Sequence, residues 1–230
     1  MKLYHDPLSA PSRAVVSFLI DEGLAFDEEI VDLMAGDHLQ PAYGMINANR
    51  QVPALVDDGF RLTEGSAILK YLGDKYASPA YAVDPHARAR INEALDWFNT
   101  NFHTYFCHYM VYTSILPDYT SMNAVSRADL EHLGALRSRK YFEILDRHML
   151  KDRDFVCGDE ISIADYLGAA FVTLGETISY DLRRYPNVTA WVARMKSRAG
   201  WEPAYATCNG FLSALRADPE RMAAVLAAHP

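Results

Sequence analysis

The sequence predicts two regions of different architecture, an α/β region followed by an all-helical region. Short apolar runs alternate with helical patterns over residues 1–78, whereas no strand-like alternation follows Pro85. Residues 77–85 contain two prolines among small residues, which is typical of a linker. The charge divides similarly: residues 1–78 carry 6 basic and 12 acidic side chains, and residues 79–230 carry 16 and 18. We therefore expect domains over residues 1–78 and 86–230.

The first region is expected to run strand, helix, strand, helix, and then a hairpin followed by a helix. Pro11 suits the first turn of a helix, where a missing N–H costs nothing, and Gly23 ends that helical pattern. The Asp58-Gly59 pair is a turn signal between two strands. The expected strands cover residues 2–5, 26–31, 52–56 and 60–62, and the expected helices cover residues 11–22, 39–46 and 64–76.

The second region shows helical periodicity in five segments. Ser162 and Asp165 have the spacing of a capping box, with Asp in place of Glu, and we interpret them as structural. The five expected helical segments are residues 86–116, 124–150, 162–180, 187–199 and 201–216.

Composition and charge disfavour several classes of protein. Of the 230 residues, half are apolar and 23% are charged, as in ordinary globular proteins. The net charge, 22 − 30 = −8, disfavours binding to nucleic acid. No apolar run approaches the roughly 18 to 20 residues of a membrane span, and the first residues lack the apolar core of a secretory leader. Cys107, Cys157 and Cys208 are scattered, which indicates free thiols and a cytoplasmic location.

The turn over residues 6–12 joins the first strand to the first helix. The free N–H groups of the helix therefore point at whatever lies above the turn and stabilise an anion there. Ser9 stands just before the helix, where its hydroxyl either caps the helix or donates to a ligand such as a thiolate. Ser12 and Tyr4 are alternative donors, and a simple N-cap remains the alternative role for Ser9.

A second candidate segment is Gln51-Val52-Pro53, at the start of an expected strand. Proline has no N–H to give to a strand ladder, which leaves the backbone groups of Val52 available to a peptide-like ligand. An X–Pro bond is also where a cis peptide occurs. The alternative is an ordinary edge strand with a trans proline.

A third candidate segment, Glu64-Gly65-Ser66, opens an expected helix. The carboxylate of Glu64 can bind an ammonium group. The backbone N–H groups of Gly65 and Ser66, with the Ser66 hydroxyl, can bind a carboxylate. Together they suit the head group of an α-amino acid. The alternative is a capping arrangement alone.

Aromatic side chains recur along the first long helix of the second region. Phe106 and Met110 lie beside this stripe, and its tyrosine hydroxyls need partners, so it either forms core or lines an apolar cavity. His103 and His108 are five residues apart with no accompanying carboxylate pattern, so we predict no metal site. The stripe itself, at spacings of four, three, four and three, is Phe98, Phe102, Tyr105, Tyr109 and Tyr112.

Five segments in this order resemble one family, the cytosolic glutathione transferases, nearest their theta-like bacterial group. They are residues 3–14 around the turn serine, 37–39 with a His-Leu pair, 51–55 with the Val-Pro pair, 62–72 opening the third helix, and 162–165 with the capping box. The resemblance covers essentially the whole chain and is strongest over its first third.

The resemblance implies a thioredoxin-like N-terminal domain that binds glutathione and an all-α domain that supplies a hydrophobic electrophile site. It implies that Ser9 donates to the glutathione sulfur and that the protein is a homodimer. Seven residues are implied to contact glutathione: His38, Gln51, Val52, Pro53 (as a cis peptide), Glu64, Gly65 and Ser66. The expected electrophile site consists of Phe102, Tyr105, Phe106, Tyr109 and Met110.

The sequence departs from the family pattern at one contact. The usual Glu-Ser pair is Glu64-Gly65 here, with a serine one place later. No cysteine stands near Ser9, which disfavours the relatives that exchange thiols through such a cysteine. We therefore expect a transferase that adds the glutathione thiolate to small apolar electrophiles, without a metal. The alternatives are a non-catalytic glutathione or hydrophobic-ligand binding protein and a glutathione-dependent disulfide or peroxide reductase.

Overall fold

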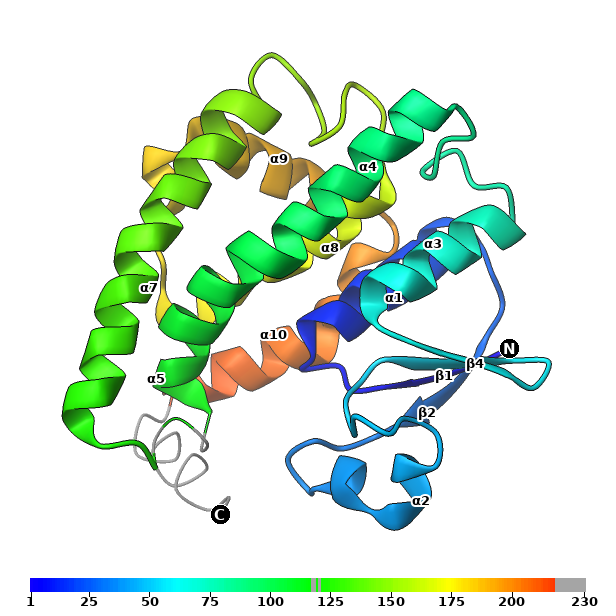
Figure 1. Ribbon diagram of the computed structural model, residues 1–230, viewed down its shortest axis with the longest axis horizontal. Coiled ribbons are helices and arrows are strands. Elements are labelled where there is room, and N and C mark those ends of the chain that lie inside the picture. The colour runs from blue at the N-terminus through cyan, green and yellow to red at the C-terminus, as the bar shows by residue number, and fades with distance from the viewer. Residues whose placement is uncertain (117–118, 120, 218–230) are drawn as a thin grey trace.

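Four short strands form one mixed sheet in the first region, in the order β2-β1-β3-β4 (Figure 1). The computed structural model describes residues 1–116, 119 and 121–217. β1 pairs with β2 in parallel and with β3 antiparallel, and β3 and β4 form a hairpin. The strands are β1 (Lys2–His5), β2 (Asp27–Ile30), β3 (Ala54–Asp57) and β4 (Phe60–Thr63). The expected order of strands and helices is confirmed.

The helices of the first region lie against this sheet. In Figure 1, α1 and α3 lie between the sheet and the second region, and α2 lies beyond the opposite side of the sheet. β3 begins two residues later than expected, because Pro53 has no N–H to give to the ladder. The helices are α1 (Ala10–Asp21), η1 (Asp37–Leu39, a 3₁₀ turn), α2 (Pro41–Gly44) and α3 (Gly65–Lys75).

The second region is helical throughout its described elements. The region expected from the sequence extends to residue 230, and residues 218–230 lie outside the described residues. Among the described helices, none combines the length and apolar character needed to cross a bilayer. The elements are α4 (Pro85–Trp97), η2 (Phe98–Tyr112), α5 (Thr113–Ile115), α7 (Ala124–Ile144), η3 (Leu145–Met149), α8 (Ile163–Thr173), η4 (Leu174–Ile178), η5 (Leu182–Arg184), α9 (Pro186–Lys196) and α10 (Trp201–Ala217).

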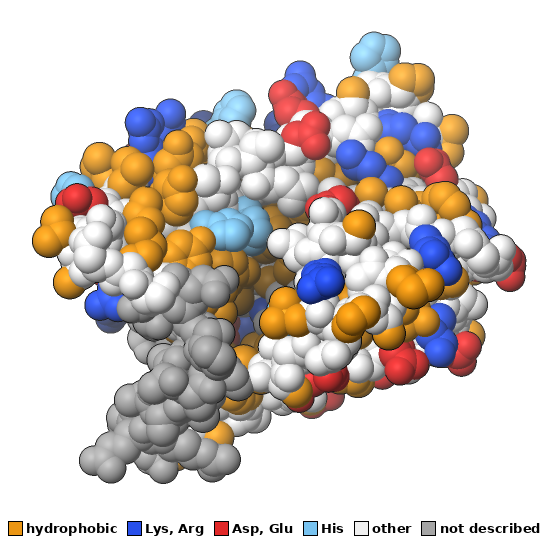
Figure 2. Space-filling model, turned by 60° about the horizontal axis from the view of Figure 1, so that its bottom comes forward, with side chains coloured by type: hydrophobic (Ala, Val, Ile, Leu, Met, Phe, Trp, Pro, Cys, Tyr) orange, Lys and Arg blue, Asp and Glu red, His pale blue; other side chains and the backbone are white. Residues whose placement is uncertain are grey.

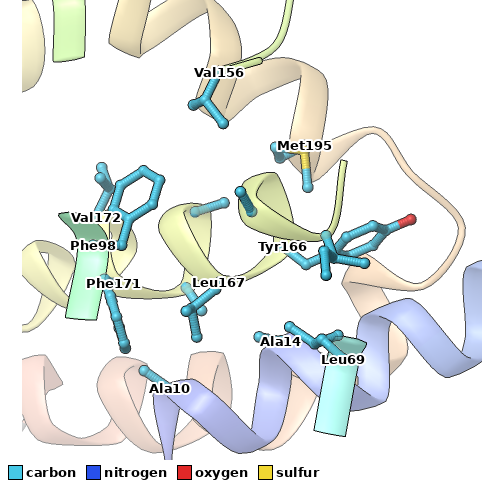
Figure 3. Close-up of a cluster of buried hydrophobic side chains, with 14 of the residues drawn as sticks. Ala10, Ala14, Leu69, Phe98, Val156, Tyr166, Leu167, Phe171, Val172 and Met195 are labelled. Atoms are coloured by element: carbon cyan, nitrogen blue, oxygen red, sulfur yellow. The ribbon is translucent and has the colours of Figure 1, made fainter. Parts of the chain in front are cut away.

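Helix α8 is buried along its whole length and packs against both regions. Figure 3 shows Leu167 and Phe171 on the side of α8 that faces α1. At its start, Asp165 accepts hydrogen bonds of 2.8 Å from the backbone N–H and the hydroxyl of Ser162. The indole N–H of Trp191 donates to the same carboxylate at 2.9 Å. These hydrogen bonds confirm the structural role expected for Ser162 and Asp165.

The η2 segment is π-helical rather than α-helical. Its i→i+5 hydrogen bonds widen each turn, so side chains spaced for an α-helix do not stay on one face. Phe102 and Phe106 lie fully buried against Phe142 of α7. Asn99 and His103, four residues apart, face the first region instead.

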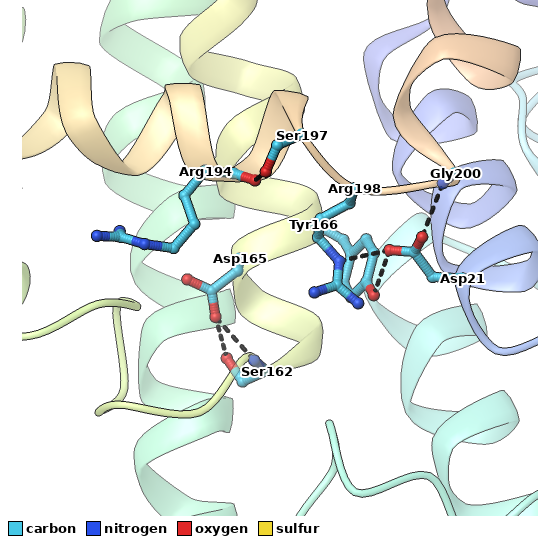
Figure 4. Close-up of polar contacts among 8 residues, drawn as sticks. All are labelled: Asp21, Ser162, Asp165, Tyr166, Arg194, Ser197, Arg198 and Gly200. Carbon is cyan, nitrogen blue, oxygen red and sulfur yellow. Dashed lines mark hydrogen bonds and ion pairs between the residues drawn. The ribbon is translucent and has the colours of Figure 1, made fainter.

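A buried carboxylate joins the two regions. Asp21, the last residue of α1, accepts hydrogen bonds from the Tyr166 hydroxyl at 2.8 Å and from Arg198 Nε at 2.5 Å (Figure 4). The backbone N–H of Gly200 donates to it at 2.7 Å. Three elements that are distant in sequence are thus held by one side chain.

Candidate functional site

A cavity of about 290 Å³ lies between the two regions. Figure 2 shows the surface hollowed there, with histidine side chains at its margin. A ligand in this cavity touches both regions at once. The first region contributes Pro11, Asn47, Gln51, Val52, Pro53, Glu64, Gly65 and Ser66, and the second contributes Asn99, His103, Leu167 and Phe171.

One wall of the cavity is the segment that leads into β3. The backbone carbonyl of Gln51 accepts two hydrogen bonds of 2.7 Å, from the Tyr43 hydroxyl and from Asn47 Nδ2. The Val52–Pro53 peptide is cis. The backbone N–H and C=O of Val52 bond to no described residue, so a ligand in the cavity can pair with them as a strand would.

A neighbouring wall is the start of α3. Glu64 has φ 68° and ψ 115°, a backbone conformation that is costly for a residue with a side chain and is often found at functional sites. Its carboxylate is exposed and bonds to no described residue. Gly65 packs closely on α1, since an added Cβ would lie 3.1 Å from the Pro11 Cβ. The Ser66 hydroxyl accepts a 3.1 Å hydrogen bond from Asn99 Nδ2 across the cavity.

Ser9 is the N-cap of α1, and it is not among the residues that line the cavity. Its Oγ accepts a 3.4 Å hydrogen bond from the backbone N–H of Ser12, which leaves its own hydroxyl proton free to donate. The turn is held by Asp6, whose carboxylate accepts from the backbone N–H of Leu8 at 2.6 Å. Ser12 is fully buried with its hydroxyl unpartnered, and Tyr4 is half-buried on β1.

Arg13, one turn into α1, is buried beside the same turn. Its Nη1 donates to the backbone carbonyls of Pro7 at 3.1 Å and Leu8 at 2.7 Å. The guanidinium lies 4.8 Å from the ring centroid of Tyr205 on α10. The turn before Ser9 is therefore supported from the C-terminal helix.

His38 lies on the short η1 turn, outside the lining of the cavity. It is half-buried, and its Nδ1 is buried with no hydrogen-bond partner among the described residues. The structure therefore brings together six of the seven residues expected to contact glutathione, with His38 as the exception.

The expected electrophile residues lie elsewhere than in this cavity. Phe102 and Phe106 are fully buried in the helical core. The rings of Tyr105 and Tyr141 stack with their centroids 5.6 Å apart, which turns Tyr105 toward α7. Tyr109 and Met110 are half-buried and do not line the cavity either.

Sequence reasoning missed six residues that do line the cavity: Pro11, Asn47, Asn99, His103, Leu167 and Phe171. No local pattern singles out Asn99 and His103, because η2 also carries Thr100, Asn101, Thr104 and His108, and only the fold shows which polar side chains reach the cavity. Burial lowers the pKa of His103 to about 3, with a smaller contribution from His108, so its imidazole is neutral. No group of three His, Cys, Asp or Glu among the described residues is arranged to hold a metal ion.

Comparisons with known proteins identify the family. Residues 3–80 match the model of the glutathione S-transferase N-terminal domain, and residues 119–199 match that of the C-terminal domain. Glutathione S-transferase D7 of Drosophila melanogaster is 33% identical over 88% of this chain and 87% of its own. The chain belongs to the glutathione S-transferase family. Mouse glutathione S-transferase theta-2 is 31% identical over 96% of this chain and 91% of its own.

Solved structures of glutathione transferases share the fold. Human glutathione transferase theta-2, in complex with glutathione and an unknown ligand, superposes with a TM-score of 0.83 at 27% identity, over 100% of this chain and 99% of that one. A delta-class glutathione transferase of Nilaparvata lugens gives 0.79 at 28% identity, over 94% and 98%. The expected glutathione transferase fold and the resemblance to theta-class enzymes are confirmed.

Proposed function

We propose that this protein binds glutathione in the cavity and catalyses the addition of its sulfur to small apolar electrophiles. The observation that carries the proposal is the unpaired backbone of Val52 beside the unpaired carboxylate of Glu64, in one cavity of a glutathione S-transferase family member. A tripeptide has a backbone that can pair with Val52 and an ammonium group that can bind the carboxylate of Glu64.

The proposed glutathione contacts are those that the family resemblance implies, and the arrangement of the cavity supports them. Val52 pairs with the cysteinyl backbone, next to the cis Pro53. Glu64 binds the γ-glutamyl ammonium, and the N-terminus of α3 at Gly65 and Ser66 binds the adjacent carboxylate. His38 and Gln51 bind the glycyl end, for which His38 keeps an unused Nδ1.

Ser9 is assigned as the donor to the glutathione sulfur. A free thiol has a pKa of about 8.5, and lowering it by two units needs about 2.7 kcal/mol. One charge-assisted hydrogen bond and a helix N-terminus supply about that much together. The free Ser9 proton and the start of α1 provide the two groups, and the buried charge of Arg13 adds positive potential nearby.

The remaining expectations belong to the same proposal. Residues 1–78 form the glutathione-binding domain, and residues 86–230 supply the wall for the electrophile. The protein is proposed to act as a cytoplasmic homodimer, as is usual for the family. The aromatic residues of η2 are proposed to support the electrophile wall from the helical core, in which Phe102 and Phe106 are fully buried.

Calorimetry and a thiolate titration test the proposal. Reduced glutathione at millimolar concentration should release heat with the wild type, and a generic aryl halide should be conjugated. In Ser9→Ala we expect the thiolate absorbance of bound glutathione to titrate at least about one unit higher. Ser12→Ala and Tyr4→Phe serve as matched comparisons. The absence of heat contradicts glutathione binding, and an unchanged titration in Ser9→Ala reassigns the donor.

A further inference from the structure

His103 presents hydrogen-bonding groups that no described residue uses. The side chain lines the cavity, its Nε2 is buried without a partner, and its Nδ1 bonds to no described residue. An imidazole left unpaired in this way costs free energy, so a partner supplied by a ligand is favoured.

The ring is held in one orientation from two sides. It stacks on Phe171 of α8 with the centroids 4.3 Å apart and the planes 17° apart. The ring of His108 meets it edge-on at 4.6 Å. A group fixed before the substrate arrives loses little entropy when it makes a hydrogen bond.

Burial beside Phe171 keeps the imidazole uncharged at physiological pH, since it lowers the pKa of His103 to about 3. A neutral imidazole carries one N–H donor and one acceptor nitrogen. It therefore suits an uncharged polar group and offers no ion pair to an anionic one.

The polar side chains of η2 near the cavity differ in whether they already have hydrogen-bond partners. Asn99 already donates to the Ser66 hydroxyl at 3.1 Å. His108 pairs through Nδ1 with the Tyr119 hydroxyl at 3.0 Å and does not line the cavity. His103 is thus the uncommitted donor on this wall of the cavity within the described residues.

We propose that His103 donates a hydrogen bond to an oxygen of the electrophile, which makes conjugated carbonyl compounds the preferred substrate class of this site. This inference rests on the proposed function, because the nucleophile is the glutathione thiolate that the proposed function places at Ser9, next to the cavity residue Pro11 at the start of α1.

The chemistry of such an addition places charge where His103 can stabilise it. The thiolate sulfur forms a bond to the β-carbon, and the electron pair of the carbon–carbon double bond moves toward the carbonyl oxygen. The resulting enolate takes a proton from water at the α-carbon, so no oxidant or reductant is required. A donor aimed at the oxygen stabilises this charge as it develops. Displacement of a halide from an alkyl carbon places no charge on an oxygen and gains nothing from the donor.

Two electrophiles of similar size separate these cases: benzylideneacetone, a conjugated ketone, and benzyl chloride. In His103→Phe we expect kcat/KM for benzylideneacetone to fall at least about 10-fold, toward the roughly 100-fold or more that loss of one preorganised oxyanion donor costs. The value for benzyl chloride should stay within about 2-fold, because the ring shape is kept. His103→Gln should recover most of the loss, since its amide also donates. His132→Phe, at an exposed position on α7, is the control and should retain both activities.

The possible outcomes distinguish a failure of the role of His103 from a failure of the proposed transferase function. Equal losses for both electrophiles in His103→Phe, or no loss for either, overturn the role of His103 while leaving the transferase in place. A wild type that conjugates neither electrophile and gives no heat with glutathione overturns the proposed function itself. The thiolate titration of bound glutathione should be unchanged in His103→Phe, which a general distortion of the site would not allow.

Discussion

The hydroxyl of Tyr43 donates a 2.7 Å hydrogen bond to the backbone carbonyl of Gln51, immediately before the unpaired backbone of Val52. Tyr43 is buried on α2, and burial raises the pKa of its phenol to about 12, so it remains a donor throughout the physiological range. A side chain outside the cavity thereby fixes the backbone that forms one of its walls.

Loss of this bond should weaken glutathione binding without slowing the chemical step. A net hydrogen bond is worth about 1 kcal/mol, so in Tyr43→Phe we expect KM for glutathione to rise about 3- to 10-fold and kcat to change less than about 2-fold. Asn47 keeps its own bond to the Gln51 carbonyl and limits the loss. Steady-state kinetics measures both constants, with Tyr76→Phe, at an exposed position, as control. An unchanged KM contradicts the positioning role.

The hairpin of β3 and β4 is tied to α3 by a buried carboxylate. Asp57 accepts hydrogen bonds from Lys75 Nζ and, at 2.8 Å, from the Tyr71 hydroxyl. The hydrogen bond from Lys75 contributes most, and with that from Tyr71 it holds the pKa of the Asp57 carboxyl below its usual value. Its contribution to stability is therefore present above the pKa of the unfolded chain and is lost as pH falls through the lower pKa of the folded state.

Asp57→Asn should accordingly destabilise the protein in a pH-dependent way. At pH 7 we expect a cost of about 1 to 2 kcal/mol. The gap to wild type should narrow below about pH 4 and close as the pH falls through the lowered pKa of the Asp57 carboxyl in the folded protein. Urea unfolding over a pH series measures this gap. Asp58→Asn, at the adjacent exposed turn position, should show a much smaller effect. A gap that stays constant with pH contradicts the assignment.

The Asp21 carboxylate should control the contact between the two regions. Asp21→Asn leaves the Arg198 guanidinium without its counter-charge, and we expect a loss of about 2 to 3 kcal/mol, reduced from a fully buried pair because the Arg198 side chain is 32% exposed. The urea midpoint of unfolding measures it, and Asp96→Asn, at an exposed position on α4, is the control. Equal midpoints for the two variants would show that the three hydrogen bonds carry no net stability.

Local patterns were enough to predict the first region, because its strands and turns are set by residues adjacent in sequence. Pro11 opens α1 and the Asp58-Gly59 turn joins β3 to β4 as expected. The unpaired backbone of Val52 in the cavity followed from the same kind of signal, since it depends on the neighbouring Pro53.

The second wall of the cavity was not predictable in the same way. The prediction of one aromatic face assumes α-helical spacing, whereas η2 is π-helical and its wider turns separate the members of the stripe. Nothing near Asn99 in the sequence indicates its bond to Ser66, 33 positions away. For His103 the sequence gives only the prediction of no metal site, because the stacking partner Phe171 lies on a different helix and only the fold brings the two together.

Replacing Gly65 with a residue that has a side chain, such as the serine usual in the family, should destabilise the protein. An added Cβ lies 3.1 Å from the Pro11 Cβ, whose position is fixed by the proline ring and by α1. We therefore expect Gly65→Ala to lower the urea midpoint, by about 1 kcal/mol in stability. Gly210→Ala on α10, where the added Cβ meets nothing within 4 Å, should raise it through helix propensity. Gly65→Ser should likewise fail to tighten glutathione binding in calorimetry, since the clash precedes any new hydrogen bond. Tighter glutathione binding by Gly65→Ser, or equal stabilisation by Gly65→Ala and Gly210→Ala, would show that α1 shifts at Pro11 to make room for the added Cβ.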